Sequence, residues 1–128
     1  LDEEVTGEYF TANGERVRSK SEIIIADHLR RYGVVYKYEK PLELTVHGRR
    51  VTFYPDFTVM NSRTGRIYYL EHFGMMDNED YYNAVLRKRD AFEMNQLLIG
   101  RDVLLLHESS SAPLNTRVLD CYIQEYLV

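Results

Sequence analysis

Apolar residues recur with helical spacing in some segments of the chain and with strand alternation in others. A capping box that begins at Ser19 (sequence SKSE) precedes a helical pattern over residues 23–32, which stops at Gly33. Strand patterns follow over residues 34–46, interrupted at Pro41, and over 50–60 and 67–73. Further patterns predict a long helix over 81–98, an apolar strand over 103–107 and a closing helix over 114–127. The order of helix, three strands, helix, strand and helix predicts an α/β (α+β) fold with a mixed central sheet flanked by helices.

The length of 128 residues predicts a single domain, because a second one would have no room. The longest unbroken apolar runs are about four residues, far short of the ~20 that a membrane helix needs, so we expect no membrane partner. Cys121 is the single cysteine and has no partner for an intramolecular disulfide, which indicates a reducing compartment such as the cytoplasm. The chain begins at Leu1 rather than Met, and we expect it to be a piece of a longer protein.

Charge is distributed unevenly along the chain, whose formal net charge is −4. Residues 16–128 carry 16 basic against 15 acidic groups, a net charge of +1. We therefore divide the chain into an acidic leader, residues 1–15, and a single domain, residues 16–128. The domain lacks the bulk basicity typical of a DNA-binding protein. The leader holds the other five acids: Asp2, Glu3, Glu4, Glu8 and Glu15.

Three acids fall at positions where periodicity predicts an unusual environment. Strand alternation places Asp56 opposite the apolar face of the strand over 50–60, and it places Glu71 among apolar and aromatic neighbours of the strand over 67–73. Helical periodicity places Glu22 on the stripe of the first helix that should face the sheet. We therefore expect three carboxylates from three elements to converge.

Convergence of three carboxylates is unfavourable unless something compensates their charge. Two like charges about 4 Å apart repel by roughly 4 kcal/mol at an effective dielectric constant near 20, so such a group must take up protons or bind a cation. Oxygen ligands suit Mg²⁺ or Mn²⁺, which shares its coordination shell with substrate phosphate. Lys88 interrupts the apolar stripe of the long helix, so its ammonium group can reach toward the sheet and stabilise charge on a transferred phosphate. The pattern predicts phosphodiester chemistry.

Three segments carry a family resemblance: RSKSE over residues 18–22, YPDF over 54–57 and YLEHFG over 69–74. They resemble the PD-(D/E)XK nuclease superfamily, and more closely the bacterial and phage nuclease domains, often attached to helicases, that carry an E-H-F-G-like segment in place of E-x-K. The resemblance covers about residues 16–108. It implies a restriction-endonuclease-like αβββαβ core and a Mg²⁺-dependent deoxyribonuclease domain that acts on DNA. It also implies a larger DNA-processing or DNA-repair protein, such as a helicase, as the parent chain.

The resemblance also implies roles for individual residues. Asp56 and Glu71 would be the metal-binding carboxylates, and Glu22 would correspond to the first-helix acid that completes the metal site in many members. The backbone carbonyl of His72 is a candidate further ligand. Because the His72 side chain points to the other strand face from Glu71, we expect its imidazole to be packed or hydrogen-bonded rather than catalytic.

One position departs from the family pattern. Phe73 stands where the family lysine normally lies, and a phenyl ring cannot hold or polarise water. Some members supply the lysine from the following helix, and Lys88 fits such a migration. Lys20 is the reserve candidate.

Other interpretations stay open beside the nuclease hypothesis. A nuclease fold whose chemistry has decayed would bind nucleic acid or a protein partner, and Phe73 supports this alternative. A structural domain of a larger motor protein would dock partners without metal and would expose an apolar patch. The individual side chains also have simpler explanations: Glu22 in a capping box, Asp56 at a strand end, Glu71 paired with an arginine, and Lys88 at the surface.

Overall fold

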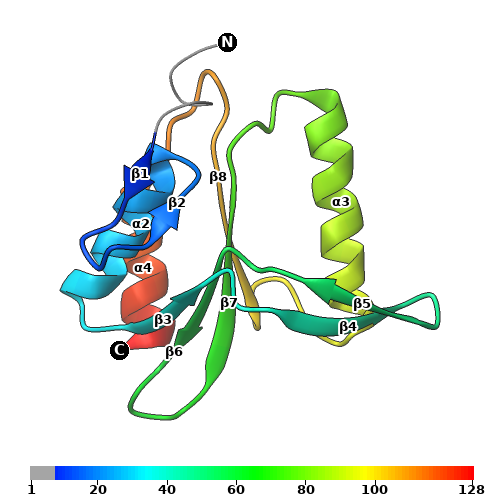
Figure 1. Ribbon diagram of the computed structural model, residues 1–128, viewed down its shortest axis with the longest axis horizontal. Helices are drawn as coiled ribbons and strands as arrows, with labels where there is room; N and C mark the ends of the chain where they lie inside the picture. Colours follow the sequence, from blue (N-terminus) through cyan, green and yellow to red (C-terminus); the bar gives the residue numbers. More distant parts are fainter. Residues whose placement is uncertain (1–7) are drawn as a thin grey trace.

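The computed structural model describes residues 8–128, so Asp2, Glu3 and Glu4 of the predicted leader lie outside the described residues. Figure 1 shows α2 and α4 on one side of the central strands and α3 on the other. The helices are α2 (Lys20–Arg31), α3 (Glu79–Met94) and α4 (Thr116–Tyr122), which continues into the π-helical turn η1 (Ile123–Leu127). The strands are β1 (Tyr9–Phe10), β2 (Arg16–Val17), β3 (Val35–Tyr38), β4 (Leu42–Val46), β5 (Arg49–Phe53), β6 (Phe57–Met60), β7 (Ile67–Phe73) and β8 (Val103–His107).

The central sheet has four strands in the order β3-β6-β7-β8. Strand β6 pairs antiparallel with β3 and β7, whereas β7 pairs parallel with β8, with Glu71 opposite Leu105. Two separate hairpins, β1–β2 and β4–β5, complete the strands. The predicted α/β fold with a mixed sheet flanked by helices is therefore confirmed. With the two hairpins set aside, the order along the chain is helix, three strands, helix and strand, as the pattern predicts.

Helix α2 begins and ends at the predicted signals. Ser19 is the N-cap residue, and its hydroxyl oxygen accepts a hydrogen bond of 3.2 Å from the Glu22 amide. At the other end, the amides of Gly33 and Val34 donate to carbonyls of the last turn in the pattern of a Schellman motif. Gly33 has φ +71°, a left-handed conformation that favours glycine, which explains why the helix stops there.

The apolar side chains form two clusters, one on each face of the central sheet. Helices α2 and α4 cover the first face, and α3 together with the β4–β5 hairpin covers the second. The first cluster is centred on Ile25, Ala26, Leu29, Phe57, Val59, Leu70, Leu104, Leu119 and Ile123. The second cluster is centred on Leu44, Ala91, Phe92 and Val103.

The segment over residues 50–60 is two strands and not the single strand that its alternation predicts. Strand β5 ends at Phe53 in the β4–β5 hairpin, and β6 begins at Phe57 in the central sheet. Pro55 has no N–H group to donate to a neighbouring strand. The Asp56 N–H group donates to the side chain of Glu71 instead of to a strand. The chain therefore changes sheets at residues 54–56, and Asp56 stands at this junction.

Two helices have different ends from those predicted. The helix expected over 81–98 begins earlier, after the N-cap residue Asn78, and it ends before Gln96, whose φ of +58° turns the chain out of the helix. The helix expected over 114–127 begins after the N-cap residue Asn115 and changes to π-helical hydrogen bonding in its last turn. No helix within the described residues is long and apolar enough to cross a membrane.

Candidate functional site

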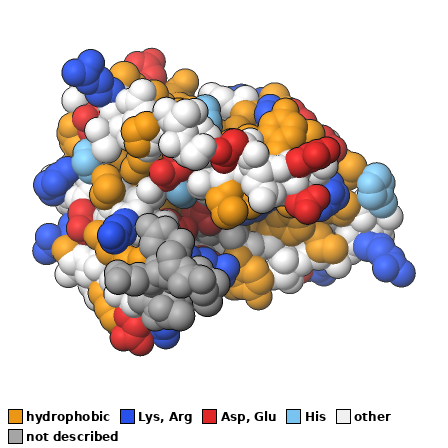
Figure 2. Space-filling view, turned by 90° about the horizontal axis from the view of Figure 1, so that it is seen from above, with side chains coloured by type: hydrophobic (Ala, Val, Ile, Leu, Met, Phe, Trp, Pro, Cys, Tyr) orange, Lys and Arg blue, Asp and Glu red, His pale blue; other side chains and the backbone are white. Residues whose placement is uncertain are grey.

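A cleft of about 530 Å³ opens where the start of α2, the 54–56 junction, the end of β7 and the start of α3 meet. Figure 2 shows acidic and histidine side chains in the middle of the face seen from above, with Lys and Arg side chains mainly near its edges. The cleft brings together side chains from segments that are far apart in the sequence. Its charged and histidine residues are Arg18, Lys20, Glu22, Asp56, His72 and Glu108.

The Glu71 side chain is bonded to the Asp56 backbone, and the Asp56 side chain is bonded to the backbone of the next residue of β7, His72. The Asp56 N–H group donates a hydrogen bond of 2.6 Å to Glu71 Oε2, and the His72 N–H group donates one of 2.7 Å to Asp56 Oδ2. Asp56 lines the cleft, whereas Glu71 lies behind it with 0% of its surface exposed. The predicted burial of Glu71 among apolar neighbours is thus confirmed.

Lys88 reaches from α3 to this pair. Its ammonium group is in contact with Glu71 Oε1, and its side chain is 27% exposed. The ammonium nitrogen also lies 6.0 Å from the centre of the Phe73 ring. Lys20, the reserve candidate, is exposed and lines the cleft. Lys88 is therefore the lysine that α3 brings to the buried carboxylate.

Glu22 lies on the buried stripe of α2, as its helical spacing predicts, and is 5% exposed. Its Oε1 atom accepts hydrogen bonds of 2.8 Å from the Arg18 amide and 3.0 Å from the Tyr38 hydroxyl. A capping box would direct this carboxylate to the amide of Ser19. Glu22 lines the same cleft as Asp56, but Arg18 and Tyr38 hold its carboxylate at the α2 side.

The His72 imidazole is hydrogen-bonded and nearly buried, which confirms its predicted environment. Its Nε2 atom lies 2.6 Å from Glu108 Oε1, and its side chain is 8% exposed. The Ser21 hydroxyl donates a second hydrogen bond of 2.5 Å to the same Glu108 oxygen. Glu108 thus ties the end of β7 to the start of α2.

Three residues of the site are missing from the sequence-based prediction: Tyr38, Tyr81 and Glu108. Tyr81 fixes the turn after β7, because its hydroxyl oxygen accepts a hydrogen bond of 3.0 Å from the Gly74 amide. Glu108 directly follows the strand over 103–107, and the parallel pairing of that strand with β7 brings it to the same end of the sheet. Its place after a buried parallel strand is the signal that could have found it.

Burial raises the pKa of all three predicted acids. Desolvation and the nearby charge of Asp56 raise the pKa of Glu71 to about 7, while Lys88 opposes the shift. Burial also raises the pKa of Asp56, against the effect of the Lys88 charge. The pKa of Glu22 is raised by burial first and by Asp56 less strongly. The site therefore favours protons or a cation beside these carboxylates.

The resemblance implies a resident Mg²⁺ ion. The oxygen and nitrogen atoms of the site show whether its side chains could bind such an ion. Within residues 8–128, no group of three or more His, Cys, Asp or Glu side chains is placed to hold a metal ion. The buried Glu71 Oε1 atom is in contact with the Lys88 ammonium group, and Glu71 Oε2 accepts the Asp56 N–H hydrogen bond. Mg²⁺ often uses one or two carboxylates and keeps several waters. Asp56, which lines the cleft, and the neighbouring Glu71 are the described carboxylates that could supply two oxygen ligands to such an ion.

Comparison with known proteins shows similarity to a distant relative. The chain is 30% identical over 123 aligned residues to an uncharacterized protein of Methanocaldococcus jannaschii. The alignment covers 86% of this chain but 10% of the relative, so the chain spans about a tenth of that protein's length. No protein-family model matches the chain. No solved structure matches it either.

Proposed function

We propose that the chain is a divalent-metal-dependent deoxyribonuclease domain that hydrolyses DNA phosphodiester bonds within a larger DNA-processing protein. The observation that carries this proposal is the contact between the Lys88 ammonium group and the fully buried Glu71, beside the cleft-lining Asp56. Carboxylates can hold a divalent ion that polarises a phosphate and activates water, and a lysine can stabilise the charge that develops on the phosphate. The resemblance to the PD-(D/E)XK superfamily, with its lysine supplied from the following helix, supports the same conclusion.

In the proposed reaction, a water oxygen attacks the phosphorus and the bond from phosphorus to the leaving sugar oxygen breaks. The water gives up a proton and the leaving oxygen gains one, so a phosphate monoester and a hydroxyl group result. Mg²⁺, when bound, would polarise the phosphate and lower the pKa of water. Asp56 and Glu71 would hold the ion, and Lys88 would orient the attacking water or stabilise charge on the phosphate. Glu22 lies across the cleft, where it can hydrogen-bond a water molecule.

DNA is the proposed partner, with no organic cofactor, and a helicase or another DNA-processing domain is the proposed context of the chain. The rim of the cleft carries Arg18 and Lys20, both exposed, which can contact backbone phosphates. The single cysteine fits the reducing cytoplasm, where DNA is processed in a prokaryotic cell.

Two measurements test the proposal with two site variants and one control. Isothermal titration with Mg²⁺ or Mn²⁺ should give binding to the wild type and none to Asp56→Ala. Cleavage of plasmid and single-stranded DNA should require the metal and should be lost in Glu71→Ala. Asp90→Ala removes an exposed acid of α3 and serves as the control that keeps both properties. Metal binding that is unchanged in Asp56→Ala would refute the proposed site.

The second candidate is a nuclease fold that binds nucleic acid or a protein without catalysis. Phe73, at the position of the family lysine, favours this candidate. The described residues also include no group of three or more side chains that could hold a metal ion. Lys88→Ala separates the two candidates. An enzyme should lose turnover in this variant while it keeps metal binding, whereas a binding module has no turnover to lose.

A further inference from the structure

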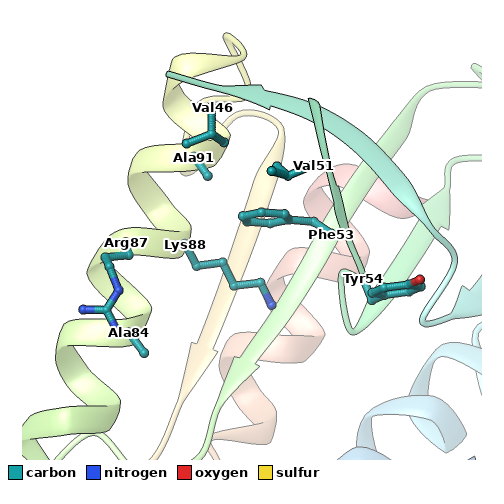
Figure 3. Close-up of a pocket in the computed structure, with 8 residues that line it drawn as sticks. All are labelled: Val46, Val51, Phe53, Tyr54, Ala84, Arg87, Lys88 and Ala91. Atoms are coloured by element: carbon teal, nitrogen blue, oxygen red, sulfur yellow. The ribbon is translucent and has the colours of Figure 1, made fainter. Parts of the chain in front are cut away.

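A second pocket, largely open to the surface and with a volume of about 410 Å³, lies between the β4–β5 hairpin and α3. Its volume falls in the range of roughly 300–1,000 Å³ that is usual for small-molecule pockets. Val46, Val51 and Phe53 form the hairpin wall, and Ala84 and Ala91 form the helix wall. Figure 3 shows the Phe53 ring projecting into the space between the hairpin and α3. The interior of this pocket is apolar and contains the face of an aromatic ring.

The two walls are fixed to each other, so the pocket exists before a ligand binds. Asn95, which caps α3, accepts a hydrogen bond of 3.0 Å from the Thr45 amide and donates one of 2.9 Å to the Thr45 carbonyl oxygen. The Phe53 ring packs edge-to-face on Phe92 of α3, with 6.2 Å between the ring centres. A preformed pocket binds its ligand with a smaller ordering cost, because its walls are already in place.

The edge of the pocket carries cations and an exposed aromatic ring. Arg87 and Lys88 line it from α3, and Tyr54 lines it from the junction after β5. Tyr54 is 54% exposed, so its ring is accessible to a ligand. No acid is among the described residues that line the pocket. This combination of an apolar slot, aromatic faces and positive charge matches a nucleotide, whose base is flat and whose phosphate is anionic.

The pocket borders the proposed catalytic site through Lys88. Lys88 lines the pocket with its side chain while its ammonium group contacts Glu71. Tyr54 lies two residues before Asp56 on the same junction. Figure 3 shows Lys88 extending from α3 toward the strands, between Arg87 and Tyr54. A nucleotide with its base in the pocket would thus place an adjoining phosphate near the carboxylates.

We propose that this pocket binds an unpaired nucleobase, so that the substrate of the domain is single-stranded nucleic acid next to the scissile phosphate. The inference rests on the proposed nuclease function, because it names the substrate class of the same site. A base inside a duplex is stacked and paired, and it would have to leave the helix before it could enter the slot. Unpaired bases stack on aromatic side chains without that cost.

The test is equilibrium binding of a fluorescein-labelled single strand in EDTA, where no hydrolysis occurs. Val51→Trp fills the pocket from the hairpin wall and should weaken binding about tenfold, the effect of losing one stacked base. Thr52→Trp adds the same ring to the exposed, opposite face of β5 and should leave the affinity unchanged. Tyr54→Leu, at an exposed position, should weaken binding, and Tyr54→Phe should restore it.

A second strand separates base recognition from phosphate attraction. A strand in which abasic linkers replace the nucleosides keeps the charge and removes the bases. The wild type should bind it about tenfold more weakly than the intact strand, and Val51→Trp should bind the two strands equally. Equal binding of the two strands by the wild type would overturn the inference, as would wild-type affinity in both Val51→Trp and Tyr54→Leu. If the pocket instead binds an apolar side chain of a protein partner, we expect the results that overturn the inference.

The experiments distinguish a failure of the base-binding pocket from a failure of the nuclease proposal. Metal-dependent cleavage that requires Asp56, together with binding that ignores the pocket variants, would overturn the base pocket and leave the nuclease standing. Absence of cleavage, together with base-dependent binding that Val51→Trp abolishes, would overturn the nuclease and support the pocket.

Discussion

Replacing Glu71 with glutamine should make the metal-free protein more stable at neutral and alkaline pH. The side chain is fully buried, and its Oε1 atom is in contact with the Lys88 ammonium group. Glutamine has nearly the same shape and carries no charge, so it removes the unfavourable burial of a carboxylate. Its amide group can still accept the Asp56 N–H hydrogen bond that Glu71 Oε2 accepts.

The size of the effect follows from the raised pKa of Glu71. Burial and Asp56 raise this pKa from an ordinary 4.5 to about 7 in the folded protein. The folded state therefore binds the proton more tightly than the unfolded state. This stabilising contribution is complete below pH 4.5 and is lost as the pH rises through about 7. A tenfold change in proton affinity corresponds to ~1.4 kcal/mol, so the carboxylate penalises folding by about 3 kcal/mol at alkaline pH.

Glutamine removes this penalty but also leaves Lys88 without its carboxylate partner, so we expect a net gain of about 1–3 kcal/mol at about pH 8. The assay is urea unfolding of the wild type and Glu71→Gln in EDTA at several pH values between about 5 and 8. The variant should show the gain at the alkaline end and lose it toward the acidic end. Glu93→Gln, an exposed position on α3, is the control and should follow the wild type. A Glu71→Gln protein that is no more stable than the wild type at the alkaline end would refute the reasoning.

Three further substitutions test the packing that positions the site, each by urea unfolding. Phe92→Ala should lower the free energy of unfolding by about 3–5 kcal/mol, because this ring is 1% exposed and packs on Phe53 and Tyr69. Asn95→Ala should lower it by about 1–3 kcal/mol, since it breaks the hydrogen bonds between α3 and the β4–β5 hairpin. Gly33→Ala should lower it by about 1 kcal/mol through its φ of +71° alone, because no atom lies within 4 Å of the added Cβ.

Periodicity predicted the orientation of the buried charged side chains well. The stripe of α2 that contains Glu22 is buried as expected, and so is the strand face that contains Glu71. The inward direction of Lys88 also follows from its helical spacing to Val85 and Phe92, which are both buried. These orientations are local consequences of helix and strand geometry, so they do not depend on how the elements are arranged.

The sheet change at residues 54–56 was not predicted, because alternation of side chains continues across it. Val51 and Phe53 pack on α3, whereas Phe57 and Val59 pack on α2 and α4 at the other face of the central sheet. The pattern of apolar positions is the same for one long strand and for two short strands in different sheets. Pro55 was the available signal, since a proline within a strand pattern marks an edge or an interruption.

Hydrogen-bond partners within the site depend on the arrangement of elements and could not be read from local patterns. Tyr38 reaches Glu22 because β3 is the edge strand nearest the start of α2, and Glu108 reaches His72 because β8 is parallel to β7. Both contacts follow from the strand order β3-β6-β7-β8. The sequence pattern predicts the strands but not their order in the sheet, so it cannot identify the hydrogen-bond partners of Glu22 and His72.

The environment of Glu71 is difficult to explain as a stabilising feature of the fold. A buried ion pair gains little over an apolar pair of the same volume, because desolvation of both charges offsets their attraction. Here the balance is worse, since Asp56 adds a second negative charge that raises the pKa of Glu71. A methionine or leucine at position 71 would avoid the burial of a carboxylate, at the cost of the partner that the Asp56 N–H group and Lys88 now have. The proposed metal-binding role accounts for a carboxylate here, because a bound cation would replace the Lys88 contact and free the lysine for the substrate phosphate.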